Sequence, residues 1–176
     1  MIQFETTRLL IRNFIISDVN DFYEYMSLEC TAKYEVFEPL TYDDCIAAVM
    51  RRCSKDNVFA VVLKETGKMI GDINFSLEEY DTYELGYDFN PNYSKQGYAT
   101  EACRKVIDYI FEERNGRRIN AECDDDNISS IQLLERLGFR REGYFIEDVT
   151  FKMDSEGNPI YVNSYSYAIL KREWNR

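Results

Sequence analysis

Residues 85–101 read LGYDFNPNYSKQGYATE, and this stretch predicts a strand, a short loop and the start of a helix. The aromatic-rich run from Tyr83 to Phe89 favours the strand. Asn90-Pro91-Asn92 ends it, because proline fixes its own φ and brings no backbone donor. From Gly97 to Glu113 the apolar residues recur three or four positions apart, which is the spacing of one helical face.

The loop between this strand and this helix is a candidate phosphate site. A helix start offers unpaired N–H groups and the positive end of the dipole, and Gly97 lets a ligand approach the main chain. The loop lacks the three glycines of the dinucleotide fingerprint and the GK[ST] ending of the P-loop. On these residues alone, a ligand site and an ordinary helix start are both open interpretations.

Two segments resemble signatures of the GNAT superfamily of N-acetyltransferases. SKQGYATEA, from Ser94, resembles its pyrophosphate loop, whose pattern is Arg or Gln, two residues, Gly, any residue, then Gly or Ala. Gly97 and Ala99 match the last two fixed positions, whereas Ser94 stands where Arg or Gln is usual. NISSIQLLERLGF, residues 127–139, is similar to the second signature, in the expected order and at about the expected separation.

The ends of the chain, TTRLLIRNF (6–14) and SYSYAILKREW (164–174), resemble the RimJ/RimL-like branch of this family. The resemblance implies one acetyltransferase domain over residues 1–176. It also implies an α/β (α+β) GNAT fold: a mixed, mostly antiparallel twisted sheet of about seven strands, splayed at the acyl-CoA site, with helices on both faces. The expected strands are 8–14, 58–63, 69–77, 83–89, 118–123, 139–151 and 160–170. The other expected helices run to about Leu28 after caps at Ser17 and Asp18, from 42 to 53 after Thr41, and from 128 to 137 after Asn127.

Composition narrows the chemistry. The formal net charge is −11, which argues against a general nucleic-acid binder, since such binding depends on Lys and Arg. The acidity suits a cationic acceptor such as an amine, although it is equally explained by solubility. There is no histidine, so a general base must be a carboxylate, water or another group, and imidazole metal sites are excluded.

Cysteine usage and hydropathy predict a cytoplasmic protein. The five cysteines form no Cys-x-x-Cys pair, which favours reduced, buried thiols. The first residues lack a signal-peptide pattern, and no apolar run is long enough to span a membrane. We therefore expect neither a membrane partner nor a nucleic-acid partner, and the run Asp124-Asp125-Asp126 is expected to serve the following helix start and not a metal.

The family resemblance implies direct transfer of an acetyl group from acetyl-CoA to a primary amine. In this fold two parallel strands splay apart at a bulge, and exposed main-chain groups bind the pantetheine arm like an added strand. The residues implied at that edge are Asp88, Phe89 and Asn90. For the pyrophosphate the resemblance implies Lys95, Gln96, Gly97, Tyr98, Ala99 and Thr100, and for the rest of the CoA arm Asn127 and Ser130.

The general base is predicted to be a carboxylate. Glu84 is the main candidate, acting directly or through water, because it lies on the strand that leads to the splay. A solvated strand glutamate is the alternative, and Asp72 and Glu147 are other candidate carboxylates.

The general acid is an open assignment. Many family members carry a tyrosine in the second signature where this chain has Leu134, which cannot donate. Ser130 matches a serine placed near the thiol in the RimJ/RimL-like branch. Tyr144, Tyr165 and Tyr167 are other candidate hydroxyl donors.

The acceptor is predicted to be a protein N-terminus or a small amine. The family resemblance implies that the segment Cys30–Leu40, with Tyr34, Val36, Phe37 and Pro39, helps wall its site together with the hairpin from Phe139 to Tyr167; an ordinary packed connection is the other interpretation of this segment. Exposed aromatic residues in the final strands could form a homodimer surface. A non-catalytic acyl-CoA-binding module is the alternative function, because Ser94 and Leu134 depart from the family pattern.

Overall fold

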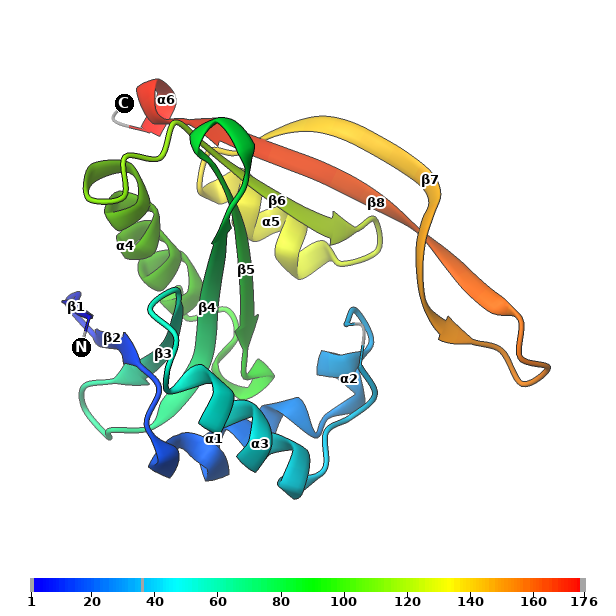
Figure 1. Ribbon diagram of the computed structural model, residues 1–176, viewed down its shortest axis with the longest axis horizontal. Coiled ribbons are helices and arrows are strands. Elements are labelled where there is room, and N and C mark those ends of the chain that lie inside the picture. Colours follow the sequence, from blue (N-terminus) through cyan, green and yellow to red (C-terminus); the bar gives the residue numbers. More distant parts are fainter. Residues whose placement is uncertain (1, 36, 175–176) are drawn as a thin grey trace.

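An eight-stranded sheet is the centre of the computed structural model, which describes residues 2–35 and 37–174 (Figure 1). The strand order is β1-β2-β3-β4-β5-β6-β8-β7, and within these described strands only β5 and β6 run parallel. This confirms the mostly antiparallel mixed sheet. The strand beyond the predicted seven is β1, whose three residues are too few to show an alternating pattern. The bounds are β1 Gln3–Glu5, β2 Leu9–Asn13, β3 Val58–Leu63, β4 Met69–Leu77, β5 Thr82–Phe89, β6 Arg118–Asp124, β7 Arg140–Met153 and β8 Pro159–Leu170.

Helices cover both faces of the sheet, as predicted (Figure 1). Helices α4 and α5 bury Val106, Ile110 and Leu133 against one face. Helices α1 and α3 bury Phe22 and Val49 against the other face, over the first strands. The bounds are α1 Val19–Met26, α2 Glu29–Ala32, α3 Tyr42–Arg52, α4 Tyr98–Glu112, α5 Ile128–Arg136 and α6 Lys171–Trp174, with 3-10 turns η1 Ile16–Asp18, η2 Glu79–Asp81 and η3 Pro91–Tyr93.

Of the four residues predicted to cap helices, Thr41 and Asn127 are confirmed as side-chain caps. Thr41 Oγ1 accepts from the Asp44 amide, and Asn127 Oδ1 accepts from the Ser130 amide at 3.1 Å. The caps predicted at Ser17 and Asp18, before α1, are wrong, because neither side chain accepts a hydrogen bond from the first turn of that helix among the described residues. The carboxylate of Asp18 instead accepts from Arg12 and from the Ile15 amide, which stabilises the turn before the helix.

All five cysteines are free thiols, but burial is less general than predicted. Cys45 and Cys103 are buried in the two cores, where the pattern of apolar residues placed them. Cys30 of α2 and Cys53, which follows the last residue of α3, are exposed, and Cys123 is half-buried. Among the described residues no helix is long and apolar enough to cross a membrane.

The parallel strands β5 and β6 separate part of the way along their length. They pair only at Thr82–Arg118, Tyr83–Ile119 and Glu84–Asn120. Beyond Glu84, strand β5 keeps a continuous register with β4, while β6 continues on β8. The expected splay is therefore found, but the expected bulge in β5 is not. The strands diverge because β5 stays paired with β4 and β6 stays paired with β8, in both cases antiparallel.

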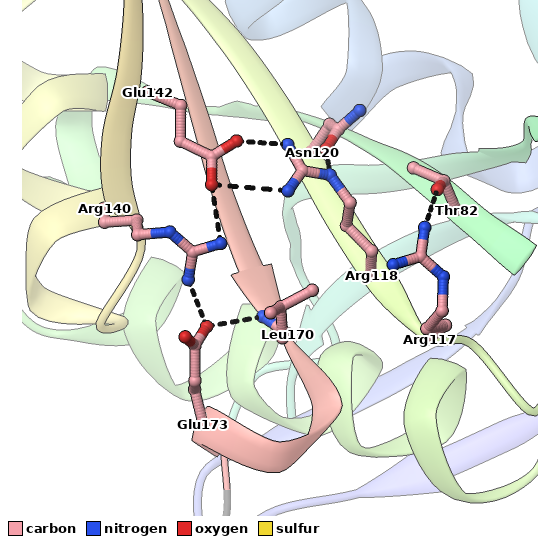
Figure 2. Close-up of polar contacts among 8 residues, drawn as sticks. All are labelled: Thr82, Arg117, Arg118, Asn120, Arg140, Glu142, Leu170 and Glu173. Atoms are coloured by element: carbon pink, nitrogen blue, oxygen red, sulfur yellow. Dashed lines mark hydrogen bonds and ion pairs between the residues drawn. The ribbon is translucent and has the colours of Figure 1, made fainter. Parts of the chain in front are cut away.

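The closed end of this opening is held by arginines (Figure 2). Arg117 donates to the Tyr80 carbonyl oxygen at 2.9 Å and to Thr82 Oγ1 at 3.3 Å, which ties the starts of β5 and β6 together. Arg118 pairs with Glu142 of β7, which also pairs with Arg140. Glu173 of α6 accepts from Arg140 and from the Leu170 amide. These bonds fix the end of the sheet from which the opening widens.

Candidate active site

The start of α4 is a set of free backbone donors. Gly97 has φ +82° and Lys95 has φ +58°, so the chain turns twice through the left-handed region before the helix begins. Among the described residues, no group accepts a hydrogen bond from an amide between Lys95 and Thr100. Gln96, Tyr98 and Ala99 are the other members of this series. Six amides at the positive end of a 15-residue helix fit a diphosphate group.

Arg8 holds this loop from the N-terminal side. Its guanidinium donates to the Gln96 carbonyl oxygen at 2.9 Å and lies 4.3 Å from the centroid of the Tyr98 ring. It also pairs with Glu101 of α4 at 2.7 Å. This role of Arg8 was not predicted from the sequence, since no local pattern links it to a loop some ninety residues away.

A cavity of about 730 Å³ lies beside the loop. It is lined by Lys95, Gly97, Thr100 and the arginines Arg104 and Arg136, among others. Arg136 donates to Thr100 Oγ1 at 3.1 Å, which joins the end of α5 to the start of α4. The two arginines were missed. Arg104 lies one helical turn after Thr100 on α4, so its place beside the loop could have been predicted from the sequence. Arg136 belongs to α5, and only the packing of α5 against α4 brings it to the cavity.

The unpaired edge of β5 contains two of the three residues expected there. Asp88 and Phe89 pair with β4, and neither has a partner on the β6 side among the described residues. Asn90 is buried and already bonded: its amide donates to the Ile70 carbonyl oxygen, and its side chain donates to Glu24. The exposed main-chain edge therefore lies before Asn90.

Across the opening, α5 brings a hydroxyl pair to the same face as α4. Ser130 Oγ lies 2.7 Å from the hydroxyl of Tyr87 on β5, and Asn127 caps the helix. Burial raises the pKa of Tyr87, so its phenol remains protonated at neutral pH. Tyr87 was missed, although its odd-numbered place on the strand puts it with the core residues Tyr83 and Leu85. Leu134, where family members carry tyrosine, is fully buried in the core.

The other candidate tyrosines lie in the final hairpin and have partners there. The Tyr144 hydroxyl donates to Asp125, and Tyr165 stacks on Tyr144 with ring centroids 4.9 Å apart. Tyr167 is fully buried and its hydroxyl accepts from Arg141. None of these three hydroxyls bonds to Tyr87 or Ser130 in the described part of the chain.

Glu84 lies on the opposite face of β5 from Tyr87, because strand residues alternate. It is exposed and occupies the last rung that β5 shares with β6, at the closed end of the opening. Burial raises the pKa of Glu122 on β6, and the Glu84 charge adds to this. Glu84 therefore lies on one face of the sheet at this opening, and Ser130 lies on the other face.

The alternative carboxylates are placed differently. Asp72 of β4 is fully buried and accepts from the Tyr25 hydroxyl at 2.7 Å. Glu147 is exposed on the hairpin of β7 and β8, with φ +51° and its amide bonded to Asn163. Asp72 shares the sheet face of Glu84, whereas Glu147 lies on the protruding arm (Figure 1).

The segment after α2 contacts the loop that precedes α5. Lys33 pairs with Asp126 at 2.7 Å, and the Tyr34 hydroxyl donates to the Asp126 carbonyl oxygen, so this segment reaches the loop before α5. Val36, named above with this segment, lies outside the described residues. A cavity of about 500 Å³ separates the segment from Lys152 of β7, and its lining includes Cys30, Lys33 and Pro39. The two elements expected to wall an acceptor site therefore face one cavity.

Comparisons with known proteins agree with this geometry. A family model described as an acetyltransferase (GNAT) domain matches residues 8–140. The chain is 39% identical over 173 residues to "Uncharacterized N-acetyltransferase YnaD" of Bacillus subtilis, covering 97% of this chain and 98% of the relative.

Solved structures give the same picture. A GNAT-family acetyltransferase from Bacillus anthracis superimposes with a TM-score of 0.89 at 34% identity, covering 98% of this chain and all of the other. A spermidine N-acetyltransferase from Vibrio cholerae, solved with CoA and spermine, has a TM-score of 0.79 at 18% identity, covering 97% and 100% of the two chains. The latter identity supports similarity of fold alone.

Proposed function

Because this chain belongs to the GNAT family of N-acetyltransferases, we propose that it moves an acetyl group from acetyl-CoA to a primary amine by direct attack in a ternary complex. The observation that carries this proposal is the series of free amides from Lys95 to Thr100 beside an opening between β5 and β6. We propose that residues 1–176 act as one domain of this kind, in the cytoplasm, within the RimJ/RimL-like branch.

Acetyl-CoA supplies the acetyl group and is bound, in this proposal, along the opening. The amides at Lys95, Gln96, Gly97, Tyr98, Ala99 and Thr100 hold its pyrophosphate. Lys95, Arg104 and Arg136 add positive charge to the same cavity. The main-chain edge at Asp88 and Phe89 binds the pantetheine arm like an added strand, with Asn90 closing that edge and Asn127 contacting the arm from α5.

The acyl group then lies toward the closed end of the opening, between two sets of side chains. On one face Glu84 takes the proton from the attacking amine, directly or through water. On the other face the Tyr87–Ser130 pair donates a hydrogen bond to the sulfur that leaves. A carboxylate base also accounts for catalysis in a chain without histidine.

The acceptor is a protein N-terminus or a small amine in this proposal. The Vibrio cholerae neighbour acts on spermidine by its name, which favours testing small amines first. The hairpin of β7 and β8 exposes Tyr144, Phe145, Ile146 and Tyr161, and we propose this arm as the surface for a homodimer.

The test is release of CoA from acetyl-CoA in the presence of a broad amine panel and N-terminal peptides. Glu84→Gln and Ser130→Ala should lower turnover strongly and leave CoA affinity, measured by calorimetry, nearly unchanged. A non-catalytic CoA-binding module is the second candidate, favoured by Ser94 and Leu134. This candidate predicts that the protein binds CoA but that no acceptor causes CoA to be released from acetyl-CoA. Such a result would refute transferase activity.

A further inference from the structure

Three carboxyl groups from three separate segments lie near one another on the sheet face that carries Glu84, which we call the acceptor face. Asp72 of β4 and Asp88 of β5 are directly opposite in the antiparallel register. Glu35, from the segment after α2, lies close enough to the Asp88 carboxyl group for each of the two groups to shift the pKa of the other. Like-charged groups directly opposite on paired strands are destabilising. This cluster, Glu35–Asp72–Asp88, therefore costs folding free energy as it stands.

No described residue forms an ion pair with the cluster, although Arg52 of α3 acts on all three groups from a greater distance. Asp72 is fully buried, and its Oδ1 has no hydrogen-bond partner in the described chain. Its other oxygen accepts from Tyr25. A buried carboxylate oxygen without a donor is unfavourable, which points to a ligand that brings positive charge and N–H groups.

The electrostatics of the three groups favour the binding of a cation. Burial raises the pKa of Glu35 to about 7 and raises the pKa of Asp88 and of Asp72 above their ordinary values. The charges of Asp72 and Asp124 add to the effect on Glu35, while Arg52 of α3 opposes it from a distance beyond ion-pair contact. A cation bound here would reverse these shifts.

The cluster is offset from the proposed reaction centre along one strand. Asp88 follows Glu84 by four positions on the same face of β5, which corresponds to about 13 Å. Glu84 and Glu122 form the acidic end near the closed part of the opening. The acceptor face thus has two acidic ends, one beside the expected thioester and one at the cluster.

We propose that the acceptor is an aliphatic amine with a second ammonium group, which the Glu35–Asp72–Asp88 cluster binds while the first amine reacts beside Glu84. The inference rests on the proposed acetyltransferase activity and deepens it. The second ammonium donates hydrogen bonds to these carboxylates and supplies the positive charge that balances them. Amines that carry a carboxylate at the far end are repelled by the same groups, which excludes amino acids.

The experiment compares α,ω-diamines of increasing chain length with monoamines of the same length. For wild-type protein kcat/KM should favour the diamine by about 10-fold or more once the chain can span the two acidic ends, as for other desolvated charge pairs. Glu35→Gln should abolish most of this preference and leave kcat/KM for monoamines unchanged. Glu65→Gln is the control, because Glu65 is an exposed glutamate in the turn between β3 and β4, outside the cluster and outside the segment expected to wall the acceptor site.

The outcomes separate this inference from the proposed function. Equal kcat/KM for diamines and monoamines, a Glu35→Gln variant that keeps the diamine preference, or a stronger preference for N-terminal peptides would overturn it while acetyl transfer stands. Absence of transfer to every amine would remove the proposed function. In that case calorimetry decides: diamine binding to wild type that Glu35→Gln abolishes supports the cation subsite, and no binding overturns it.

Discussion

The hydroxyl groups of Tyr87 and Ser130 lie 2.7 Å apart, and this contact joins β5 to α5 where β5 has already left β6. A serine hydroxyl next to a buried phenol can donate one hydrogen bond while accepting another. The pair thus offers a donor on the α5 side of the opening, in a chain where the usual tyrosine position is Leu134.

Tyr87→Phe should lower kcat by about 10-fold or more, because it removes one donor of the hydroxyl pair near the leaving sulfur. The KM for acetyl-CoA should change little, since the amides of the α4 loop are untouched. Steady-state kinetics measures both. Tyr144→Phe, which removes an exposed hydroxyl bonded to Asp125, is the control and should retain wild-type kcat. An unchanged kcat for Tyr87→Phe would rule out this role.

Gly97→Ala should weaken CoA binding, because φ +82° strains any residue with a Cβ and the new methyl group comes within 3.4 Å of Arg8. Gly157 provides a matched control: it has φ +83° in the hairpin turn and nothing within 4 Å of an added Cβ. Both variants should lose about 1 kcal/mol of stability. Only Gly97→Ala should lose CoA affinity in calorimetry, and equal affinities would argue against phosphate binding at this loop.

The double variant Arg104→Ala with Arg136→Ala should reduce CoA affinity by about 10-fold and make it less sensitive to salt, because two charges leave the cavity beside the loop. Lys105→Ala removes a charge from the next position of α4, outside that cavity, and serves as the comparison. Titrations at two salt concentrations test this, and a salt dependence equal to that of wild type would contradict it.

The stability of the protein should depend on pH through Glu35. Its pKa is raised from 4.5 to about 7, chiefly by burial; Asp88, Asp72, Asp124 and Arg52 are the charged or titratable groups that act on it. The folded state holds this proton more tightly than the unfolded state. The contribution is therefore fully present below about pH 4.5 and is lost as the pH rises through about 7.

Glu35→Gln removes this titration. Relative to wild type, the variant should gain about 2 kcal/mol of unfolding free energy between pH 5 and pH 8, after allowance for partial solvent exposure of the side chain. Urea unfolding at the two pH values measures the difference. Glu65→Gln should follow wild type, and a pH-independent difference for Glu35→Gln would show that Glu35 does not titrate in this range.

Much of the fold could be predicted from local patterns. The strand from Tyr83 to Phe89 and the helix after Gly97 are found within about one residue of their predicted ends, because both are set by neighbours in the chain. The three-residue strand β1 was not predictable in this way, since its pairing with β2 depends on a distant partner. The turn at Asp18 was also not predictable from local patterns, because the Asp18 carboxylate accepts hydrogen bonds from Arg12 on β2 and does not cap α1.

The sequence by itself determined the loop of free amides at α4, the second signature at α5 and the absence of any histidine base, because each is a property of contiguous residues or of composition. Only the tertiary structure decided that Glu35, Asp72 and Asp88 form one carboxyl cluster and that Tyr87 meets Ser130. These residues come from segments far apart in the chain. Sheet register and the path of the segment after α2 bring them together, and no local spacing encodes either.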